Sequence, residues 1–262
     1  MNRLKFKLNQ ILKIEDYSIT YDSKLLNQKN QITGLEIKKD SKIKGFIKTI
    51  LWPVFSLRNN LLVDGFIERE AGKLIKKYIK EDTVFLEVGC GDMSLRRFLP
   101  KNLCYNAFDI SLSEFHLKRV LREGQRINIA LFSATRIPLD PSAVSLIVIT
   151  EVFEHILDIN QAVSEIYRIL KLKGILIASI PNNYCYKYKR KGPNSEHINN
   201  WTFDEFKEYM NQNGFKCLEG YMIGYWIPLP LWITKTSYQL PISSKKEFYN
   251  TNFIYAFQKM KR

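Results

Sequence analysis

The sequence predicts an α/β fold in which a mostly parallel sheet carries helices on both faces. From about residue 66 onward, short segments rich in β-branched residues alternate with segments whose apolar residues recur at helical spacing. The first apolar segment also runs directly into a turn with two glycines. Because consecutive strands joined by helices lie parallel, this alternation predicts a doubly wound sheet.

Seven strands and five helices are expected in the main domain. The predicted strands span residues 84–88, 104–108, 127–132, 144–150, 174–180, 215–221 and 251–259. Four predicted helices span residues 67–79, 111–121, 160–171 and 203–214, and residues 95–99 are expected to start a fifth. The last helix opens with a capping box, in which Thr202 and Glu205 each bond the other's backbone N–H. We interpret residues 63–262 as one domain and residues 1–62 as an N-terminal extension, with a substrate lid as one interpretation of its role.

The composition limits the class of protein without deciding its function. Hydrophobic residues make up 45% of the 262 residues, which is enough for a packed core. The net charge of +14 permits nucleic acid or anionic lipid as a partner, although the basic residues are scattered. The four cysteines form no CxxC pair and the start of the chain shows no signal-peptide pattern, so a reduced, cytoplasmic protein is expected. No apolar run reaches the roughly 20 residues of a transmembrane helix.

A glycine-containing turn follows the first strand of the main domain. Gly89 and Gly91 permit a positive φ and a close approach between backbone and ligand. The turn leads into a helix N-terminus, whose free N–H groups attract polar or anionic groups. Asp109 ends the next strand, 22 positions after Glu87, where a carboxylate can accept hydrogen bonds from ribose hydroxyls. These features predict a nucleoside-containing cofactor, with an ordinary strand-to-helix turn as the alternative.

Two residues separate the cofactor classes that use such a loop. A nicotinamide cofactor needs G-x-G-x-x-G for its pyrophosphate, and Ser94 occupies the third glycine position. Glu87, two residues before the first glycine, suits a cofactor with an ammonium group and opposes a pyrophosphate. A ribose, a positive amino-acid end and no phosphate describe S-adenosylmethionine.

Several segments occur in the order typical of one family. They are Phe85-Leu86-Glu87-Val88-Gly89-Cys90-Gly91, Phe108-Asp109-Ile110-Ser111, Arg136-Ile137-Pro138-Leu139, Glu151-Val152-Phe153-Glu154-His155, Ile169-Leu170-Lys171-Leu172-Lys173-Gly174 and Ile180-Pro181-Asn182. In these segments the chain resembles the class I S-adenosylmethionine-dependent methyltransferases, in their small-molecule branch. The resemblance implies a Rossmann-like, seven-stranded sheet. The chain departs from the family's pattern at Met93, where a third glycine is common.

The resemblance also implies roles for individual residues. The loop residues expected to bind the cofactor, at its methionine end, are Glu87, Gly89, Cys90 and Gly91. Asp109 would hold the ribose, and Ile110 would pack on the adenine. Ser133 and Ala134 stand where the family binds the adenine edge, and Thr150 lies beside the sulfonium.

Four polar residues are candidates for the chemistry. Glu151, Glu154 and His155 fall at i, i+3 and i+4, and share one face if a helix starts after the fourth strand; His197 precedes the capped helix. In one interpretation, His155 or His197 accepts the proton of a substrate hydroxyl. In another, all four hold a divalent metal, as in the small-RNA 3′-terminal 2′-O-methyltransferases and ubiquinone-pathway O-methyltransferases that the pattern resembles. A purely structural role is the third interpretation.

Two apolar, aromatic segments, residues 43–57 and 224–233, are candidates for the substrate side. They would line a pocket, touch a membrane surface, or pack as a lid or dimer face. Residues 184–192 interleave aromatic and basic side chains, a pattern typical of contacts with sugars, bases and phosphate and also of solvated loops.

The sequence therefore predicts an S-adenosylmethionine-dependent methyltransferase. The leading hypothesis is O-methylation of a small-molecule, glycan or lipid-linked hydroxyl. An RNA 2′-O-methyltransferase with a divalent metal is the second, and it ranks lower because no recognisable RNA-binding module accompanies the motif. A catalytically degenerate cofactor-binding protein is the third.

Overall fold

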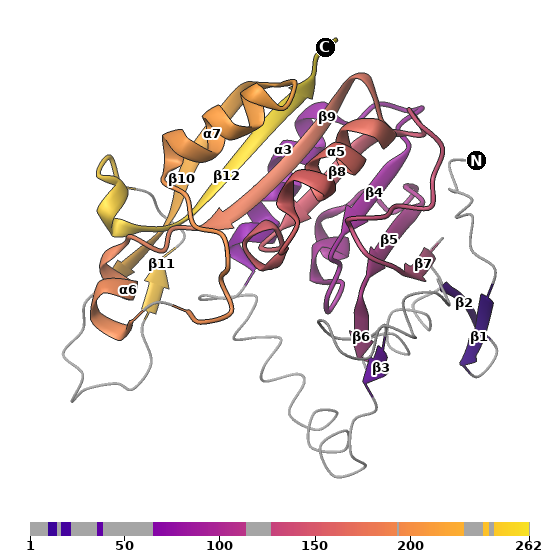
Figure 1. Cartoon of the computed structure of the whole chain (residues 1–262), viewed down its shortest axis with the longest axis horizontal. Coiled ribbons are helices and arrows are strands. Elements are labelled where there is room, and N and C mark those ends of the chain that lie inside the picture. The colour runs from indigo at the N-terminus through magenta and orange to yellow at the C-terminus, as the bar shows by residue number, and fades with distance from the viewer. Residues whose placement is uncertain are drawn as a thin grey trace.

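The computed structural model describes residues 10–14, 17–21, 36–38, 65–113, 127–192, 194–227, 238–240 and 244–261. They contain a ten-stranded sheet whose strands are, in spatial order, β1 (Gln10–Ile14), β2 (Tyr17–Tyr21), β7 (Ile127–Leu131), β5 (Tyr105–Asp109), β4 (Phe85–Val88), β8 (Val144–Thr150), β9 (Leu170–Pro181), β12 (Asn250–Lys259), β10 (Phe215–Ile227) and β11 (Tyr238–Leu240). Two short strands, β3 (Glu36–Lys38) and β6 (Ser111–Ser113), form a separate parallel pair. Figure 1 shows this arrangement.

The seven central strands confirm the predicted Rossmann-like sheet. The strands β7, β5, β4, β8 and β9 run parallel, whereas β12 is antiparallel to both of its neighbours, β9 and β10. The carboxyl ends of the parallel strands therefore lie along one edge of the sheet, together with the first residues of β12 (Figure 1). In open α/β sheets this edge binds ligands.

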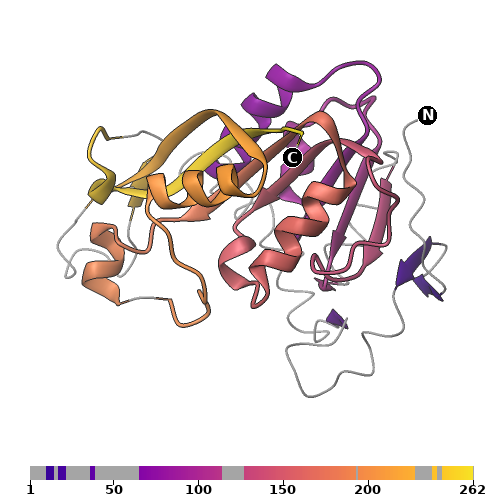
Figure 2. The ribbon, with the colours of Figure 1, turned by 45° about the horizontal axis from the view of Figure 1, so that its top comes forward.

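Helices cover both faces of the sheet, as expected (Figure 2). They are α3 (Phe66–Tyr78), α5 (Ile159–Ile169) and α7 (Phe203–Gln212). Ile166 of α5 and Phe206 of α7 are buried against one face, and Ile75 of α3 is buried against the other. The capping box of α7 is present, because Thr202 and Glu205 exchange both side chain-to-backbone hydrogen bonds.

Two of the predicted helices were wrong in part. Instead of an α-helix over residues 95–99, the chain forms a 3-10 helix, η1 (Ser94–Phe98), because Pro100 cannot continue a helix. Instead of starting a helix, residues 111–113 form β6, whose backbone is paired with β3. The remainder of that expected helix lies outside the described residues.

A third predicted helix differs only at its end. α5 stops at Ile169, because Leu170 already has an extended backbone and begins β9. Three short helices are also present: η2 (Phe153–His155), α6 (Tyr186–Lys191) and η3 (Glu247–Tyr249). The strand β10 continues to Ile227, six residues beyond the predicted end at residue 221. Residues 43–57 and 228–233 lie outside the described residues. No helix in the described ranges is long and apolar enough to span a bilayer.

Strands that the sequence did not predict join the N-terminal extension to the sheet. β2 pairs in parallel with β7, through Thr20 opposite Ala130 and Tyr21 opposite Leu131. β1 pairs with β2 and forms the edge of the sheet. The domain boundary proposed between residues 62 and 63 falls outside the described residues and stays a prediction.

The junction between α5 and β9 depends on a buried lysine. The Lys259 side chain is 8% exposed, and its Nζ donates to the carbonyls of Tyr167 at 2.6 Å and Leu170 at 2.7 Å. A cation at a helix C-terminus also interacts favourably with the helix dipole. The lysine therefore fixes the point at which the helix ends and β9 begins.

We expect Lys259→Met to lower the free energy of unfolding by about 2 kcal/mol, because two buried carbonyls lose a charged donor. Urea unfolding measures this change. Lys261→Met is the matched control, since Lys261 is exposed and its replacement should change stability by less than about 0.5 kcal/mol. Equal stability of the two variants would show that the bonds to Lys259 contribute nothing.

Candidate active site

The two glycines of the loop after β4 have different surroundings. Gly89 has a φ of 71°, and a Cβ added there would lie 2.3 Å from Cγ2 of Val152, so the loop is packed against the chain after β8. Gly91 has a φ of 47°, and a Cβ there would meet nothing within 4 Å. Gly89 is therefore required by packing, whereas the space over Gly91 is open to a ligand.

Asp109 ties the glycine loop to the end of β5. Its Oδ2 accepts the Gly91 N–H at 2.8 Å, and its Oδ1 accepts the Ser111 N–H at 3.1 Å. Ile110, between them, is an apolar residue with 39% of its surface exposed. The structure thus brings Gly91, Asp109 and Ile110 together at the carboxyl edge of the sheet, as the sequence predicts.

Met93 stands where the family commonly has a glycine, and it combines a strained backbone with a buried side chain. Met93 has a φ of 60°, the left-handed conformation that glycine adopts without strain. Its side chain is 1% exposed and belongs to the core on the α3 side of the sheet. Burial of the methionine therefore offsets the strain of its backbone.

Glu87 lies beneath the loop and not on its surface. Its buried carboxylate accepts a hydrogen bond from the Tyr105 hydroxyl on the neighbouring strand. Burial raises the pKa of Glu87 well above its usual value, and the charges of Glu68, Asp92 and Asp109 raise it further. Glu68, which sequence reasoning missed, accepts a hydrogen bond from Ser94 Oγ at 2.8 Å.

Glu151 joins three strand ends. Directly after β8 it takes a left-handed backbone with a φ of 54°. Its Oε1 accepts from Ser179 Oγ in β9 at 2.8 Å, and its Oε2 accepts from Asn252 Nδ2 in β12 at 2.7 Å. Burial raises the pKa of Glu151 to about 7, although both hydrogen bonds oppose that increase.

The bend at Glu151 changes the predicted arrangement of the acidic pair. The sequence predicts one helical face for Glu151, Glu154 and His155, but only the short 3-10 helix η2 forms there. Glu151 turns toward β9 and β12, and the atoms that lie within 4.8 Å of one another come from Glu154, His155 and His197. The structure therefore brings three of the four predicted residues together, with Glu151 beside them.

Glu154 is the buried member of this cluster. It is 1% exposed, and neither carboxylate oxygen has a hydrogen-bond partner among the described residues. Burial raises the pKa of Glu154 well above its usual value, and the charge of Glu151 raises it further. An unpartnered buried carboxylate costs free energy, so it needs a proton, a cation or a ligand.

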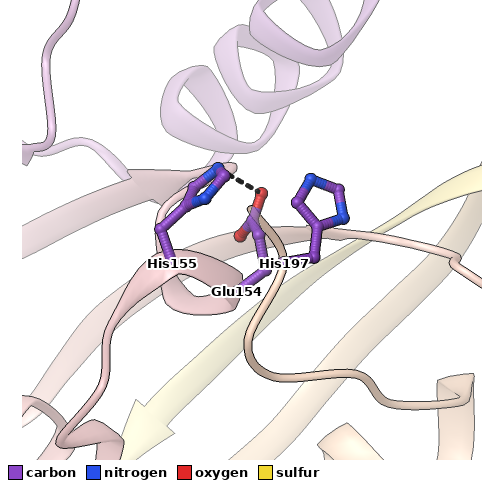
Figure 3. A group of neighbouring side chains, drawn as sticks. All are labelled: Glu154, His155 and His197. Carbon is purple, nitrogen blue, oxygen red and sulfur yellow. Dashed lines mark ion pairs between the residues drawn. The ribbon is translucent and has the colours of Figure 1, made fainter. Parts of the chain in front are cut away.

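The two histidines surround that carboxylate (Figure 3). Their rings are 5.1 Å apart, and His155 Nε2 lies 3.7 Å from Glu154 Oε1. His155 Nδ1 is 3.0 Å from the Glu196 carbonyl oxygen, and His197 Nδ1 is 2.8 Å from Asn183 Oδ1. Both Nδ1 atoms therefore donate their protons away from the cluster, and a ring nitrogen of each histidine faces Glu154.

His197 is held on both sides. Its Nε2 also accepts from Asn194 Nδ2 at 2.8 Å, and the Tyr188 ring packs edge-on at 6.0 Å. Partial burial lowers the pKa of His197, and the nearby His155 and Lys187 lower it further. A neutral imidazole is the form that accepts protons or binds metals.

The other predicted cofactor residues occupy the same edge. Thr150 is the last residue of β8, opposite Ser179. Cys90 is buried in the loop, and its N–H donates to the Phe108 carbonyl at 3.1 Å. Ser133 Oγ is already engaged with Thr135 Oγ1 at 2.8 Å. Ala134 follows it and is nearly buried.

Sequence reasoning missed the residues that hold the acidic pair and the histidines. Ser179 and Asn252 hold Glu151, and Asn183 holds His197. A signal was present for Ser179, a polar residue in the apolar second half of β9, whereas Asn252 ends the polar run Asn250-Thr251-Asn252 that opens β12. Asn183 follows β9 in a loop, and nothing in its sequence context distinguishes it.

Known methyltransferases are similar to part of this chain. A family model described as a methyltransferase domain matches residues 86–178. A probable S-adenosylmethionine-dependent methyltransferase of Mycolicibacterium smegmatis is 27% identical over 132 residues, which are 50% of this chain and 51% of that protein. Over these residues the chain is similar to S-adenosylmethionine-dependent methyltransferases, and the matches support the class I family.

Solved structures share the fold of this chain. The YcgJ protein of Bacillus subtilis has a TM-score of 0.58 at 13% identity, covering 74% of this chain and 99% of that chain. The 1,6-didemethyltoxoflavin-N1-methyltransferase of Burkholderia thailandensis, solved with bound 1,6-didemethyltoxoflavin and S-adenosylhomocysteine, has a TM-score of 0.53 at 14% identity, covering 74% and 79%. At such identities the likeness concerns the fold alone. The chain spans about half the length of the curated relatives that it matches.

We expect the two loop glycines to respond differently to alanine. Gly89→Ala should destabilise the protein because its Cβ collides with Val152. Gly91→Ala should cost only about 1–2 kcal/mol of backbone strain but weaken S-adenosylhomocysteine binding, because its Cβ enters the open space. Urea unfolding and calorimetric titration measure the two effects. Wild-type affinity in Gly91→Ala would place the cofactor elsewhere.

Proposed function

We propose that this methyltransferase transfers the methyl group of S-adenosylmethionine to a hydroxyl of a small-molecule, glycan or lipid-linked acceptor. The supporting observation is the cluster of Glu154, His155 and His197 at the carboxyl edge of the sheet, beside the end of β8. A hydroxyl is a weak nucleophile until its proton is removed, and the cluster supplies groups that can remove it.

The cofactor residues fit a nucleoside with a positively charged amino-acid end. We infer that the Asp109 carboxylate accepts hydrogen bonds from the ribose hydroxyls and that the exposed Ile110 packs on the adenine. The open space over Gly91 admits the cofactor backbone. Asp92 and Glu68 place negative charge near the loop, and a cation bound there would favour the ionised form of the buried Glu87; this combination favours an ammonium group over a phosphate.

For the acceptor, we assign proton removal to His155. Its Nδ1–H is fixed on the Glu196 carbonyl, so Nε2 carries the lone pair that accepts the hydroxyl proton. The Glu154 carboxylate, 3.7 Å from that atom, stabilises the imidazolium that then forms. The nucleophilic oxygen must also lie in line with the sulfur–methyl bond, which is a matter of positioning.

The same cluster also fits a divalent metal. Metal-binding histidines usually donate their second ring N–H to an oxygen, and both His155 and His197 do so. His197 Nε2 accepts from Asn194 and would have to release that bond to become a ligand. The unpartnered carboxylate of Glu154 would supply the third ligand. A metal at this place lowers the pKa of a coordinated hydroxyl. The Glu151 carboxylate is bound to Ser179 and Asn252, and would have to release one of them to become a ligand.

Cofactor binding is tested first. Asp109→Ala should weaken S-adenosylmethionine binding by roughly tenfold or more, because one to two charged hydrogen bonds to the ribose are lost. Asp82→Ala is the matched control, since Asp82 is exposed in the turn before β4. Calorimetric titration measures both. Failure of the wild-type protein to bind millimolar cofactor would exclude the proposed function, and unchanged affinity in Asp109→Ala would exclude the ribose assignment.

The metal and the histidine base are separated by direct binding of Mn²⁺ to chelator-treated protein. If the cluster holds metal, the wild type binds Mn²⁺ at one site and Glu154→Gln binds at least tenfold more weakly, since the charged ligand is gone. Glu196→Gln is the control, because Glu196 is bonded to His155 and Asn194 through its backbone, which the substitution keeps, and its exposed side chain acts on His197 only through its charge. Absence of Mn²⁺ binding, with methylation that resists chelator and is lost in His155→Asn, would instead identify the base mechanism.

A further inference from the structure

The N-terminal extension meets the main domain at the two segments that flank the proposed nucleoside site. β3 pairs with β6, which starts immediately after Asp109 and Ile110. β2 pairs with the last residues of β7, just before the predicted adenine-edge residues Ser133 and Ala134. Figure 1 shows β3 beside β6, and β2 beside β7.

Strand pairing and two hydrogen bonds to the Asp109 carboxylate connect β3 with the glycine loop. β6 begins with Ser111, which is paired with Glu36 of β3. The Ser111 N–H donates to Asp109 Oδ1 at 3.1 Å, and Asp109 Oδ2 accepts from the Gly91 N–H at 2.8 Å. The position of Ser111 therefore helps to set the orientation of the carboxylate that we assign to the ribose.

The pairing of β2 with β7 also leads to Asp109, through Phe132, which follows β7. The Phe132 N–H, directly after β7, donates to the Asp109 carbonyl at 3.0 Å. The Phe132 ring stacks on Phe108, with centroids 3.8 Å apart. The end of β7, which β2 borders, is thus bonded to the end of β5. Both contacts of the extension converge on Asp109.

We propose that β3 is a positioning element of the cofactor site, and that its pairing with β6 and the binding of the S-adenosyl group stabilise each other. This inference rests on the proposed function, because it assumes that the nucleoside binds at Asp109. It places β2 and β3 on the nucleoside side of the edge. The acceptor cluster lies at the end of β8, which β4 and β5 separate from β7. A substrate lid formed by these strands is therefore not favoured.

The coupling between ligand binding and β3–β6 pairing is expected because this strand pair is short. β3 and β6 share three residue pairs, and a two-stranded unit of this length is marginally stable on its own. A ligand that requires the paired arrangement must supply free energy to hold it, so its affinity falls when pairing is weakened. Linkage is reciprocal, so the ligand must also strengthen the pairing.

Hydrogen exchange of the full-length protein tests the coupling without a variant. With saturating S-adenosylhomocysteine, the amides of β3 and β6 should exchange more slowly than in the free protein. β11 is the internal control, because it is also a three-residue strand but lies at the opposite edge of the sheet. Unchanged exchange in β3 and β6, with binding confirmed by titration, would overturn the inference and leave the proposed function intact.

Two proline substitutions, one in β3 and one in β11, provide the second test. Ile37→Pro, at the centre of β3, should raise the dissociation constant of S-adenosylhomocysteine about tenfold, within the usual range of coupling between sites. Gln239→Pro, at the centre of β11, should leave it unchanged. Ile37→Val should behave as wild type because valine preserves the strand.

The outcomes separate the two proposals. Equal affinities in wild type, Ile37→Pro and Gln239→Pro would overturn the positioning role of β3. If Ile37→Pro fails to fold, as its thermal unfolding would reveal, the exchange measurement on the wild type decides the question. A wild-type protein that binds no S-adenosylhomocysteine would overturn the proposed function, and with it the coupling.

Discussion

The proposed acceptor side of the site depends on the hydrogen bonds of one partly buried carboxylate. Glu151 binds Ser179 of β9 and Asn252 of β12 immediately after it leaves β8, so it fixes three strand ends to one another. The left-handed backbone at Glu151 is held by these bonds, and it directs the chain into η2. The placement of Glu154 and His155 is a consequence of that turn. Strain of this kind persists where the surroundings hold it, and it is frequent at functional sites.

The charges of the site run opposite to those of the whole molecule. The chain has a net charge of +14, yet Glu87, Glu151 and Glu154 are withdrawn from water at the ligand-binding edge. Burial raises the pKa of each, so each carboxylate is poised to respond to a cation or a proton brought near it. The two ends of the edge differ in what surrounds the acid. Glu87 is bonded to a tyrosine, whereas Glu154 faces two imidazoles.

Local sequence patterns predicted the strands of the central sheet, but they did not predict the bend at Glu151 or the strands of the N-terminal extension. The strand 144–150 and the Thr202 capping box depend on nearby residues, and both were predicted with their observed bounds. The bend at Glu151 depends on Ser179 and Asn252, which are distant in sequence, so helical spacing alone misplaced Glu151. β3 and β6 form only because they pair with each other, and such non-local pairing leaves a weak signal in a short polar segment. The predicted cofactor residues Gly91, Asp109 and Ile110 lie at or near the ends of β4 and β5, where the local pattern is clear, and their roles stay predictions.

Met93 gives the cofactor loop a property that a glycine there would not have. A glycine holds such a turn through backbone freedom alone, independently of its neighbours. Here the turn is held by a side chain anchored in the core between α3 and the sheet. Substitutions deep in that core, at fully buried residues such as Leu95, therefore affect the conformation of the loop. Selection on the loop therefore also acts on the residues of the hydrophobic core that hold Met93. The loop and the α3-side core are expected to evolve together.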